Sequence, residues 1–355
     1  MQTAKPRFPI RELLLHGWLP SPLKKLFYRL KGYRIGKGVR LALGSVLIGT
    51  NVDIGPETEL GFFSFVRGRS IRIGANVQIG SASFIDTPYL EIGDGTKINE
   101  QVFIGGLQFP DSRLVIGRNC QIMQMTFVNP TRSIVIGDDT GIGGDCLLFG
   151  HTSWLSRFDG YPVEFESIEI GNSVSIAWRV FVLPGTRIGD GAVIGANSLV
   201  RGTIPPRCLA VGFPARVVAK EPEFPRVLSL AEKATILREV VDEFVSRLRG
   251  EGISCRLEGN YLHAESTVRR GWTRQTIRQR VYVANDTLDQ TSAMNADVVL
   301  SLHRIPDALR SGISRAGAMW LDLDAKERSD AGNELGEETV SHLRRHGVRF
   351  FRVKS

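Results

Sequence analysis

A six-residue period runs through the middle of the chain, from about residue 35 to residue 220. Each repeat carries an aliphatic residue, usually followed by Gly, and a small residue three positions later. A fixed period of six is typical of a parallel β-helix, in which each hexad forms one strand and one turn and three hexads close a coil. An ordinary β-sandwich would need two-residue alternation, which the repeats lack. We therefore expect about seven stacked coils with aliphatic cores, marked by Ile-Gly pairs that begin at Ile48, Ile54, Ile73, Ile79, Ile92, Ile116, Ile136, Ile142, Ile170, Ile188 and Ile194.

Composition and charge restrict the class of protein. Of the 355 residues, 42% are hydrophobic and 23% charged, and no apolar run is long enough to span a membrane. The net charge of +8 suits a polyanionic ligand or an acidic membrane surface. Nucleic acid is disfavoured as a partner because the scattered basic residues accompany no recognition motif. The N-terminus lacks the apolar segment of a secretory signal, so we expect a cytoplasmic protein, with or without peripheral contact to the inner membrane.

The four cysteines form no CxxC pair. Cys120 and Cys146 occupy the small corner position of their hexads, which predicts buried, reduced thiols rather than a disulfide or a metal site.

The repeats divide the chain into three parts. Residues 1–34 precede them and predict two short helices, residues 35–220 form the β-helix, and residues 221–355 predict a small α/β domain that opens with a long helix. The second N-terminal helix sets Leu23, Leu26, Phe27 and Leu30 on one face and basic residues elsewhere. Such a helix packs its apolar face over the open end of a β-helix or lies on an anionic membrane, and the pattern leaves both roles open. The C-terminal part shows no motif that names a chemistry.

The longest irregularity in the repeats points to the functional region. Ile136 and Ile170 begin successive coils but lie 34 residues apart, 16 more than three hexads require. Insertions in solenoids form loops on one edge, often the binding face. This loop is rich in aromatic residues, Trp154 among them, and it holds His151, the one histidine of the repeat region. Imidazole has an unperturbed pKa suited to a general base near neutrality, so His151 is the candidate catalytic residue.

The stretch from this loop onward resembles a known family. It is similar to the left-handed β-helix (hexapeptide-repeat) acyltransferases, in particular the branch of galactoside, maltose and xenobiotic acetyltransferases. The resemblance covers about a quarter of the chain and implies a left-handed coil, a homotrimer with active sites between β-helices, and acetyl-CoA as acyl donor without a metal. The matching phrases are Gly150-His151, IEIGN at residues 168–172, VLPGTRIG at 182–189, VIGANS at 193–198 and IPPRCLAVGFPAR at 204–216.

The same resemblance assigns roles to individual residues. His151 would take a proton from the acceptor, whose oxygen or nitrogen then attacks the acetyl thioester. A backbone N–H of Ala177 or Trp178 would stabilise the oxyanion. The remaining cofactor contacts would come from Gly195 and Ala196 along the pantetheine arm and from Arg201, Arg216 and Lys220 near the phosphates. The chain departs from the family pattern in two places, with Ser175 where many relatives have Trp and Arg201-Gly202 where many have Thr-Lys, and both departures bear on the CoA contacts.

Residues near the histidine are candidates for the acceptor side of the site. Asn129 should lie about one strand spacing, roughly 5 Å, from the start of the loop and could bond the acceptor. Trp154 could pack against the ligand or a neighbouring subunit, and Asp159 could contact the acceptor or, like Asp145, orient the imidazole. A turn-forming Asp in a solenoid is ordinarily only a turn residue, so these two assignments carry less weight.

Several functions compete on this fold. A carbonic anhydrase of the β-helix type would need three converging histidines, and the repeat region has one. A non-catalytic scaffold, an acyl-carrier-protein-dependent acyltransferase and an N-acetyltransferase of a nucleotide-linked amino sugar remain open. The N-terminal phrase LPSPLKKLFYRLKGYRIG at residues 19–36 is similar to the opening of acetyltransferases from polysaccharide and O-antigen biosynthesis. We therefore expect O-acetylation of a sugar hydroxyl on a cell-surface polysaccharide or its precursor.

Overall fold

The structure is a computed structural model of the chain. It describes residues 9–153, 155–270, 273–330 and 332–353, with the backbone alone between 266 and 275. The chain divides into two compact units, Met1–Val227 and Leu228–Ser355. The first unit is built around one buried apolar cluster and the second around two, one on each face of its sheet.

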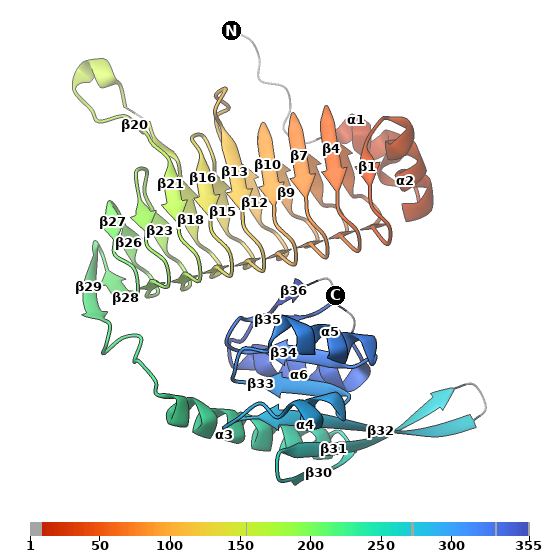
Figure 1. Cartoon of the computed structure of the whole chain (residues 1–355). Coiled ribbons are helices and arrows are strands. Elements are labelled where there is room, and N and C mark those ends of the chain that lie inside the picture. The colour runs from red at the N-terminus through yellow and green to blue at the C-terminus, as the bar shows by residue number, and fades with distance from the viewer. Residues whose placement is uncertain (1–8, 154, 271–272, 331, 354–355) are drawn as a thin grey trace. The chain divides into compact units, whose positions relative to one another are not determined.

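The first unit is a left-handed parallel β-helix with three sheets, as the repeats predict (Figure 1). Sheet A contains β1 (Arg34–Ile35), β4 (Asn51–Ile54), β7 (Ser70–Ile73), β10 (Tyr89–Ile92), β13 (Arg113–Ile116), β16 (Ile134–Ile136), β21 (Ile168–Ile170), β24 (Arg187–Ile188) and β27 (Thr203–Ile204). Sheet B contains β2 (Arg40–Leu41), β5 (Glu59–Leu60), β8 (Gln78–Ile79), β11 (Lys97–Ile98), β14 (Gln121–Ile122), β17 (Gly141–Ile142), β22 (Ser175–Ile176), β25 (Val193–Ile194), β28 (Cys208–Gly212) and the antiparallel β29 (Ala215–Lys220). Sheet C contains β3 (Val46–Ile48), β6 (Phe65–Arg67), β9 (Phe84–Asp86), β12 (Phe103–Gly105), β15 (Phe127–Asn129), β18 (Leu147–Phe149), β23 (Phe181–Val182) and β26 (Leu199–Val200).

Eight coils are complete in the described chain, and β27 and β28 begin a ninth. Our expectation of about seven was too low because the Ile-Gly pairs that we counted begin at Ile48, whereas the first coil starts at Ile35 and has no glycine directly after its second strand, which ends at Leu41. The repeated isoleucines fill the prism: Ile73, Ile92, Ile116 and the corresponding residues of the other coils are nearly inaccessible.

Small polar residues close the corners, as the hexad pattern predicts. Thr58 Oγ1, for example, donates a 2.8 Å hydrogen bond to the carbonyl of Gly74 in the next coil. Cys120 and Cys146 take the same position and are buried free thiols, each donating to a carbonyl of the following coil. Burial raises the pKa of both thiols to about 11, so they stay protonated and unreactive.

The N-terminal segment forms α1 (Ile10–Glu12), a π-helical turn η1 (Leu13–Gly17) and α2 (Ser21–Leu30) at one end of the β-helix (Figure 1). Lys24 and Tyr28 of α2 are buried there. Lys24 Nζ donates to the carbonyls of Ala42 and Ser45, at 2.5 and 3.1 Å, and the backbone N–H of Leu47 donates to Tyr28 Oη at 2.9 Å. The segment therefore closes the first coil.

The second unit is a mixed seven-stranded sheet covered by helices on both faces. The strands, in sheet order, are β30 (Ser254–Glu258), β31 (Tyr261–Arg270), β32 (Thr273–Ala284), β33 (Val298–Ser301), β34 (Met319–Asp322), β35 (Glu327–Ser329) and β36 (Phe351–Val353). One face packs on α3 (Leu230–Gly250) and α6 (Glu334–Arg345), the other on α4 (Gln290–Met294) and α5 (Asp307–Arg315). Among the described residues of either unit, no helix is both long and apolar enough to cross a membrane.

Candidate functional site

His151 stands where the chain leaves sheet C. After β18, Gly150 donates a 3.0 Å backbone hydrogen bond to Asn129, and β19 (His151–Thr152) then pairs with β20 (Glu164–Phe165), which returns the loop to the coil. A Cβ on Gly150 would lie 3.0 Å from the Asn129 oxygen and from the Arg132 nitrogen. Because residue 150 is a glycine, the start of the loop can lie in direct contact with the previous coil. This contact fixes the position of His151 along the axis of the β-helix.

Aromatic rings enclose one side of the imidazole. His151 stacks on Phe165, with ring centroids 5.8 Å apart and planes 9° apart, and Phe165 meets the edge of Phe109 at 5.4 Å. The guanidinium of Arg132 lies 4.7 Å above Phe109 and is held by a 2.7 Å ion pair to Asp111. These packed rings hold the imidazole in one orientation and keep water from one of its faces.

Phe109 belongs to a second, shorter loop, residues 106–112, between β12 and β13. Our sequence reasoning missed it as part of the site. Its signal was the 24-residue step from Ile92 to Ile116, which exceeds a regular coil and contains the Phe109-Pro110 pair.

The environment of His151 favours its neutral form. Burial lowers the pKa of the imidazole below the ordinary 6.5. Nδ1 is buried and has no hydrogen-bond partner within the described ranges, so Nε2 is the ring nitrogen left to meet a ligand. A neutral imidazole with one reachable nitrogen can accept a proton at pH 7.

The residues predicted on the acceptor side of the site differ in their position relative to His151 and in their hydrogen bonds. Asn129 lies beside the loop in β15, but its Oδ1 accepts bonds from the N–H and hydroxyl of Thr131, at 3.3 and 2.6 Å, so that oxygen supports the backbone. Asp145 pairs with Arg179 at 3.3 Å. Asp159 is exposed in η2 (Arg157–Asp159), at the far end of the loop from β19, so the structure does not bring it to His151. Trp154 lies outside the described residues.

The predicted cofactor residues lie at another corner of the prism. Ala177, Trp178, Gly195 and Ala196 follow strands β22 and β25 at the corner between sheets B and C. The N–H of Ala177 is already donated to Ile194, at 2.9 Å, so it cannot serve an oxyanion. The N–H groups of Trp178 and Ala196 have no partner in the described chain and remain available. Of Ala177 and Trp178, only Trp178 therefore keeps a backbone N–H without a partner in the described residues.

Of the three basic residues predicted near the phosphates of CoA, one is held in an ion pair and two have exposed side chains. Arg201 pairs with Glu164 of β20, so it braces the histidine loop. Arg216 and Lys220 lie on β29 with exposed side chains, at the end of the β-helix beyond Ala196.

Two corners that flank sheet C thus carry the two halves of the predicted site. The corner between C and A carries His151, and the corner between B and C carries the free N–H groups, at the level of the adjoining coils. A single copy does not bring them together, because sheet C separates them.

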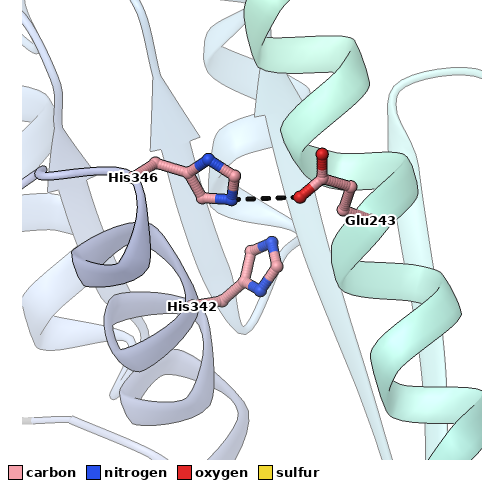
Figure 2. A group of neighbouring side chains, drawn as sticks. All are labelled: Glu243, His342 and His346. Carbon is pink, nitrogen blue, oxygen red and sulfur yellow. Dashed lines mark ion pairs between the residues drawn. The ribbon is translucent and has the colours of Figure 1, made fainter.

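The described chain has two other features of the kind that form sites, a surface cavity and a group of potential metal ligands. A shallow cavity of about 430 Å³ lies on the outside of sheet A, but its charged residues Glu169 and Arg187 pair with each other at 3.6 Å and it contains none of the predicted residues. In the second unit, Glu243, His342 and His346 place potential metal ligands within 4.8 Å of one another (Figure 2).

That second group already has a packing role. His346 pairs with Glu243 at 3.3 Å, which joins α6 to α3. His342 is buried, stacks on Phe244 with ring centroids 5.0 Å apart, and its Nε2 lies 2.9 Å from the carbonyl of Val240. Metal binding through that nitrogen would require breaking this bond.

Comparisons with known proteins find similar acetyltransferases over part of the chain. No family model matches the chain. It is 34% identical over 113 residues to a putative lipopolysaccharide biosynthesis O-acetyl transferase, WbbJ, of Escherichia coli, a match covering 29% of this chain and 58% of the relative. It is 38% identical over 112 residues to the galactoside O-acetyltransferase of the same organism, covering 29% and 54%. The chain resembles the hexapeptide-repeat acetyltransferases.

The predicted resemblance is thereby confirmed, while the chain spans only a little over half the length of those two relatives. A probable acetyltransferase of Mycobacterium tuberculosis is 33% identical over 147 residues, covering 39% of this chain and 45% of the relative. Among solved structures, the polysialic-acid-specific acetyltransferase NeuO aligns with a TM-score of 0.38 and 21% identity, over 53% of this chain and 78% of that one.

Proposed function

We propose that the chain is an acetyl-CoA-dependent O-acetyltransferase that modifies a sugar hydroxyl of a cell-surface polysaccharide or its precursor. The observation that carries the proposal is His151, a neutral imidazole with one reachable nitrogen, fixed at the base of a loop by ring stacking. The similarity to two proteins named as O-acetyltransferases supports the reaction, and the polysaccharide context follows the lipopolysaccharide relative.

The reaction needs a base, an oxyanion donor and alignment, and no covalent enzyme intermediate. Nε2 of His151 takes the proton of the acceptor hydroxyl as its oxygen attacks the thioester carbonyl. The N–H of Trp178 donates to the oxyanion of the tetrahedral intermediate. When the C–S bond breaks, the sulfur of CoA leaves as thiolate and receives the proton from His151, so the imidazole is neutral again.

We propose that the site is completed by a second copy in a homotrimer. Sheet C would face the three-fold axis, which sets the C–A corner of one copy against the B–C corner of the next at the same height. The outer side of sheet C suits such an interface because Phe84, Phe103 and Phe127 stack along it, with centroids 5.1 Å apart, and are only partly buried in a single chain.

Acetyl-CoA would lie along the B–C corner. The pantetheine arm would pass Gly195 and Ala196, where the N–H of Ala196 is available, and Arg216 and Lys220 would meet the phosphates. Arg201 takes a smaller part in this scheme than the family pattern implies, because its guanidinium is paired with Glu164.

The test is release of CoA thiol from acetyl-CoA in the presence of acceptors. A panel of free sugars, nucleotide-linked amino sugars, lipopolysaccharide and capsular glycans would be tried with the wild type and with His151→Ala. Turnover on a glycan hydroxyl, lost in the variant while acetyl-CoA still binds, supports the proposal. Transfer only to an amine would favour N-acetylation, and absence of acetyl-CoA binding by the wild type would leave a β-helix scaffold.

A further inference from the structure

The N-terminal helix α2 is packed with its polar side inward. Lys24 and Tyr28 have no exposed surface, whereas Leu23, Leu26 and Leu30 are exposed, the last of them by 80%. A surface helix of a globular protein normally buries its apolar side. The reversed orientation needs a physical reason, and a surface for the apolar side to meet.

The reason for the inward polar side lies in the end of the β-helix. The first coil exposes backbone carbonyl and N–H groups that no earlier coil can satisfy. Lys24 Nζ donates to Ala42 and Ser45, and Tyr28 Oη accepts from the Leu47 N–H and lies 3.1 Å from Nδ1 of His16, which is also buried. These polar groups occupy the inward side of α2, so its leucines are turned outward.

The preceding turn extends the same exposed surface. Phe27 of α2 stacks on His16 of η1 at 4.9 Å, so the two segments lie side by side. We define the N-terminal apolar patch as the eight exposed large apolar residues of these segments: Ile10, Leu14, Leu15, Trp18, Leu23, Leu26, Phe27 and Leu30. This is nearly a third of the exposed large apolar side chains in the described chain, gathered within 21 residues. Such a concentration marks an interaction surface.

Charge identifies the partner. Residues 1–31 contain seven Lys or Arg and one acidic residue, Glu12, in a chain whose net charge is +8. On the helical wheel of α2, Lys31 flanks the leucines on one side and Lys25 and Arg29 on the other. Apolar residues bordered by cations are the pattern of a helix that lies in a bilayer interface with anionic headgroups. A second copy of the same patch would instead bring like charges together.

We propose that the N-terminal apolar patch docks on the surface of a bilayer that contains anionic lipid. The helices lie parallel to the membrane, their leucines enter the headgroup boundary, and the flanking cations contact the lipid phosphates. The same segment therefore closes the β-helix with its polar side and binds lipid with its apolar side. Docking requires no acetyl transfer, so failure of either proposal is separate from failure of the other.

The test is flotation of the full chain with vesicles. Phosphatidylcholine vesicles with and without about 30 mol% phosphatidylglycerol would be compared, with Leu26→Ser/Leu30→Ser as the patch variant. The wild type should float with the anionic vesicles, and the partition coefficient of the patch variant should be at least about tenfold lower. Lys25→Gln/Lys31→Gln should lose the preference for anionic lipid, and about 0.5 M salt should weaken wild-type binding.

The control is Ile236→Ser/Leu257→Ser, which replaces two exposed apolar residues outside the patch, in the second unit. It should float like the wild type. Circular dichroism should be unchanged in every variant, since all the substituted side chains project outward or are half exposed. Absence of wild-type flotation, or equal loss in the control, would overturn the proposal. So would a wild type that ignores vesicles but whose oligomer mass falls when Leu26 and Leu30 are replaced, because the patch would then bind another copy.

Discussion

Removal of one backbone N–H tests the chemistry assigned to the B–C corner. Trp178→Pro deletes the N–H proposed to hold the oxyanion, and the fold should accept it. Trp178 takes the second position of a turn whose third residue, Arg179, has φ of 58°. That geometry is a type II turn, which favours proline at the second position. The chain already uses this arrangement elsewhere, where Pro56, Pro184 and Pro206 each precede a residue of positive φ.

The matched control is Trp178→Ala, which removes the indole but keeps the N–H. The proline variant deletes no hydrogen bond within the described chain, because the Trp178 N–H has none there. Loss of one oxyanion donor costs about 2.7–4 kcal/mol in the barrier, or about 10²–10³-fold in kcat. Both variants lose the packing of the indole on Gly144, so the difference between them isolates the N–H.

The assay is steady-state thiol release with saturating acceptor, with circular dichroism to establish folding. We expect the kcat of Trp178→Pro to fall by about 10²–10³-fold relative to Trp178→Ala, with a smaller change in KM, since the oxyanion exists only after attack. A proline variant with kcat within a few-fold of the alanine variant would refute the assignment.

Three further predictions concern protonation and packing. Burial lowers the pKa of His151, and the neutral form is the base, so the acid limb of kcat/KM should lie below pH 6.5; a limb above 6.5 would contradict the assignment. Ile136→Ala should lower the free energy of unfolding of the β-helix, measured in urea, by about 2–5 kcal/mol. The neighbouring Val135 is half exposed, so Val135→Ala should lower it far less, and equal decreases would argue against an aliphatic core at Ile136. Burial also lowers the pKa of His342, so as the pH falls this histidine is protonated at a higher pH in the unfolded chain than in the folded one. The free energy of unfolding of the second unit should therefore decrease below about pH 6.5. The decrease should be smaller in His342→Gln, and an equal decrease in the variant would count against a buried neutral histidine.

The β-helix could be predicted from sequence because its constraint is repeated. Each coil must place an aliphatic residue inward and a residue of positive φ or small size at the corner. Ile92 meets the first requirement and Thr96 the second, and the same spacing recurs in the other coils. His151 could be found because a loop interrupts this register. The second loop, at Phe109, went unnoticed because its insertion is short and only packing against Phe165 makes it part of the site.

The limits of the sequence reasoning have physical causes. Which N–H groups of the coils are free depends on the ladder between coils, so Ala177 and Trp178 could not be told apart before the bond from Ala177 to Ile194 was known. The length of the hairpin formed by β31 and β32 could not be predicted, because its outer part is polar and lacks an apolar alternation. The orientation of α2 could not be predicted, because the periodicity of its sequence defines an apolar and a polar face but not which of the two packs against the first coil.

Subunit complementation tests the central claim, that His151 of one copy works with Trp178 of the next. His151→Ala and Trp178→Pro chains would be co-expressed with different tags, and oligomers carrying both tags would be purified and assayed. Each variant alone should be nearly inactive. A mixed trimer, whichever variant it holds twice, has one of its three sites with both His151 and Trp178 intact, so activity should return toward about a third of the wild-type value. Mixed oligomers as inactive as the single variants would contradict a site shared between copies.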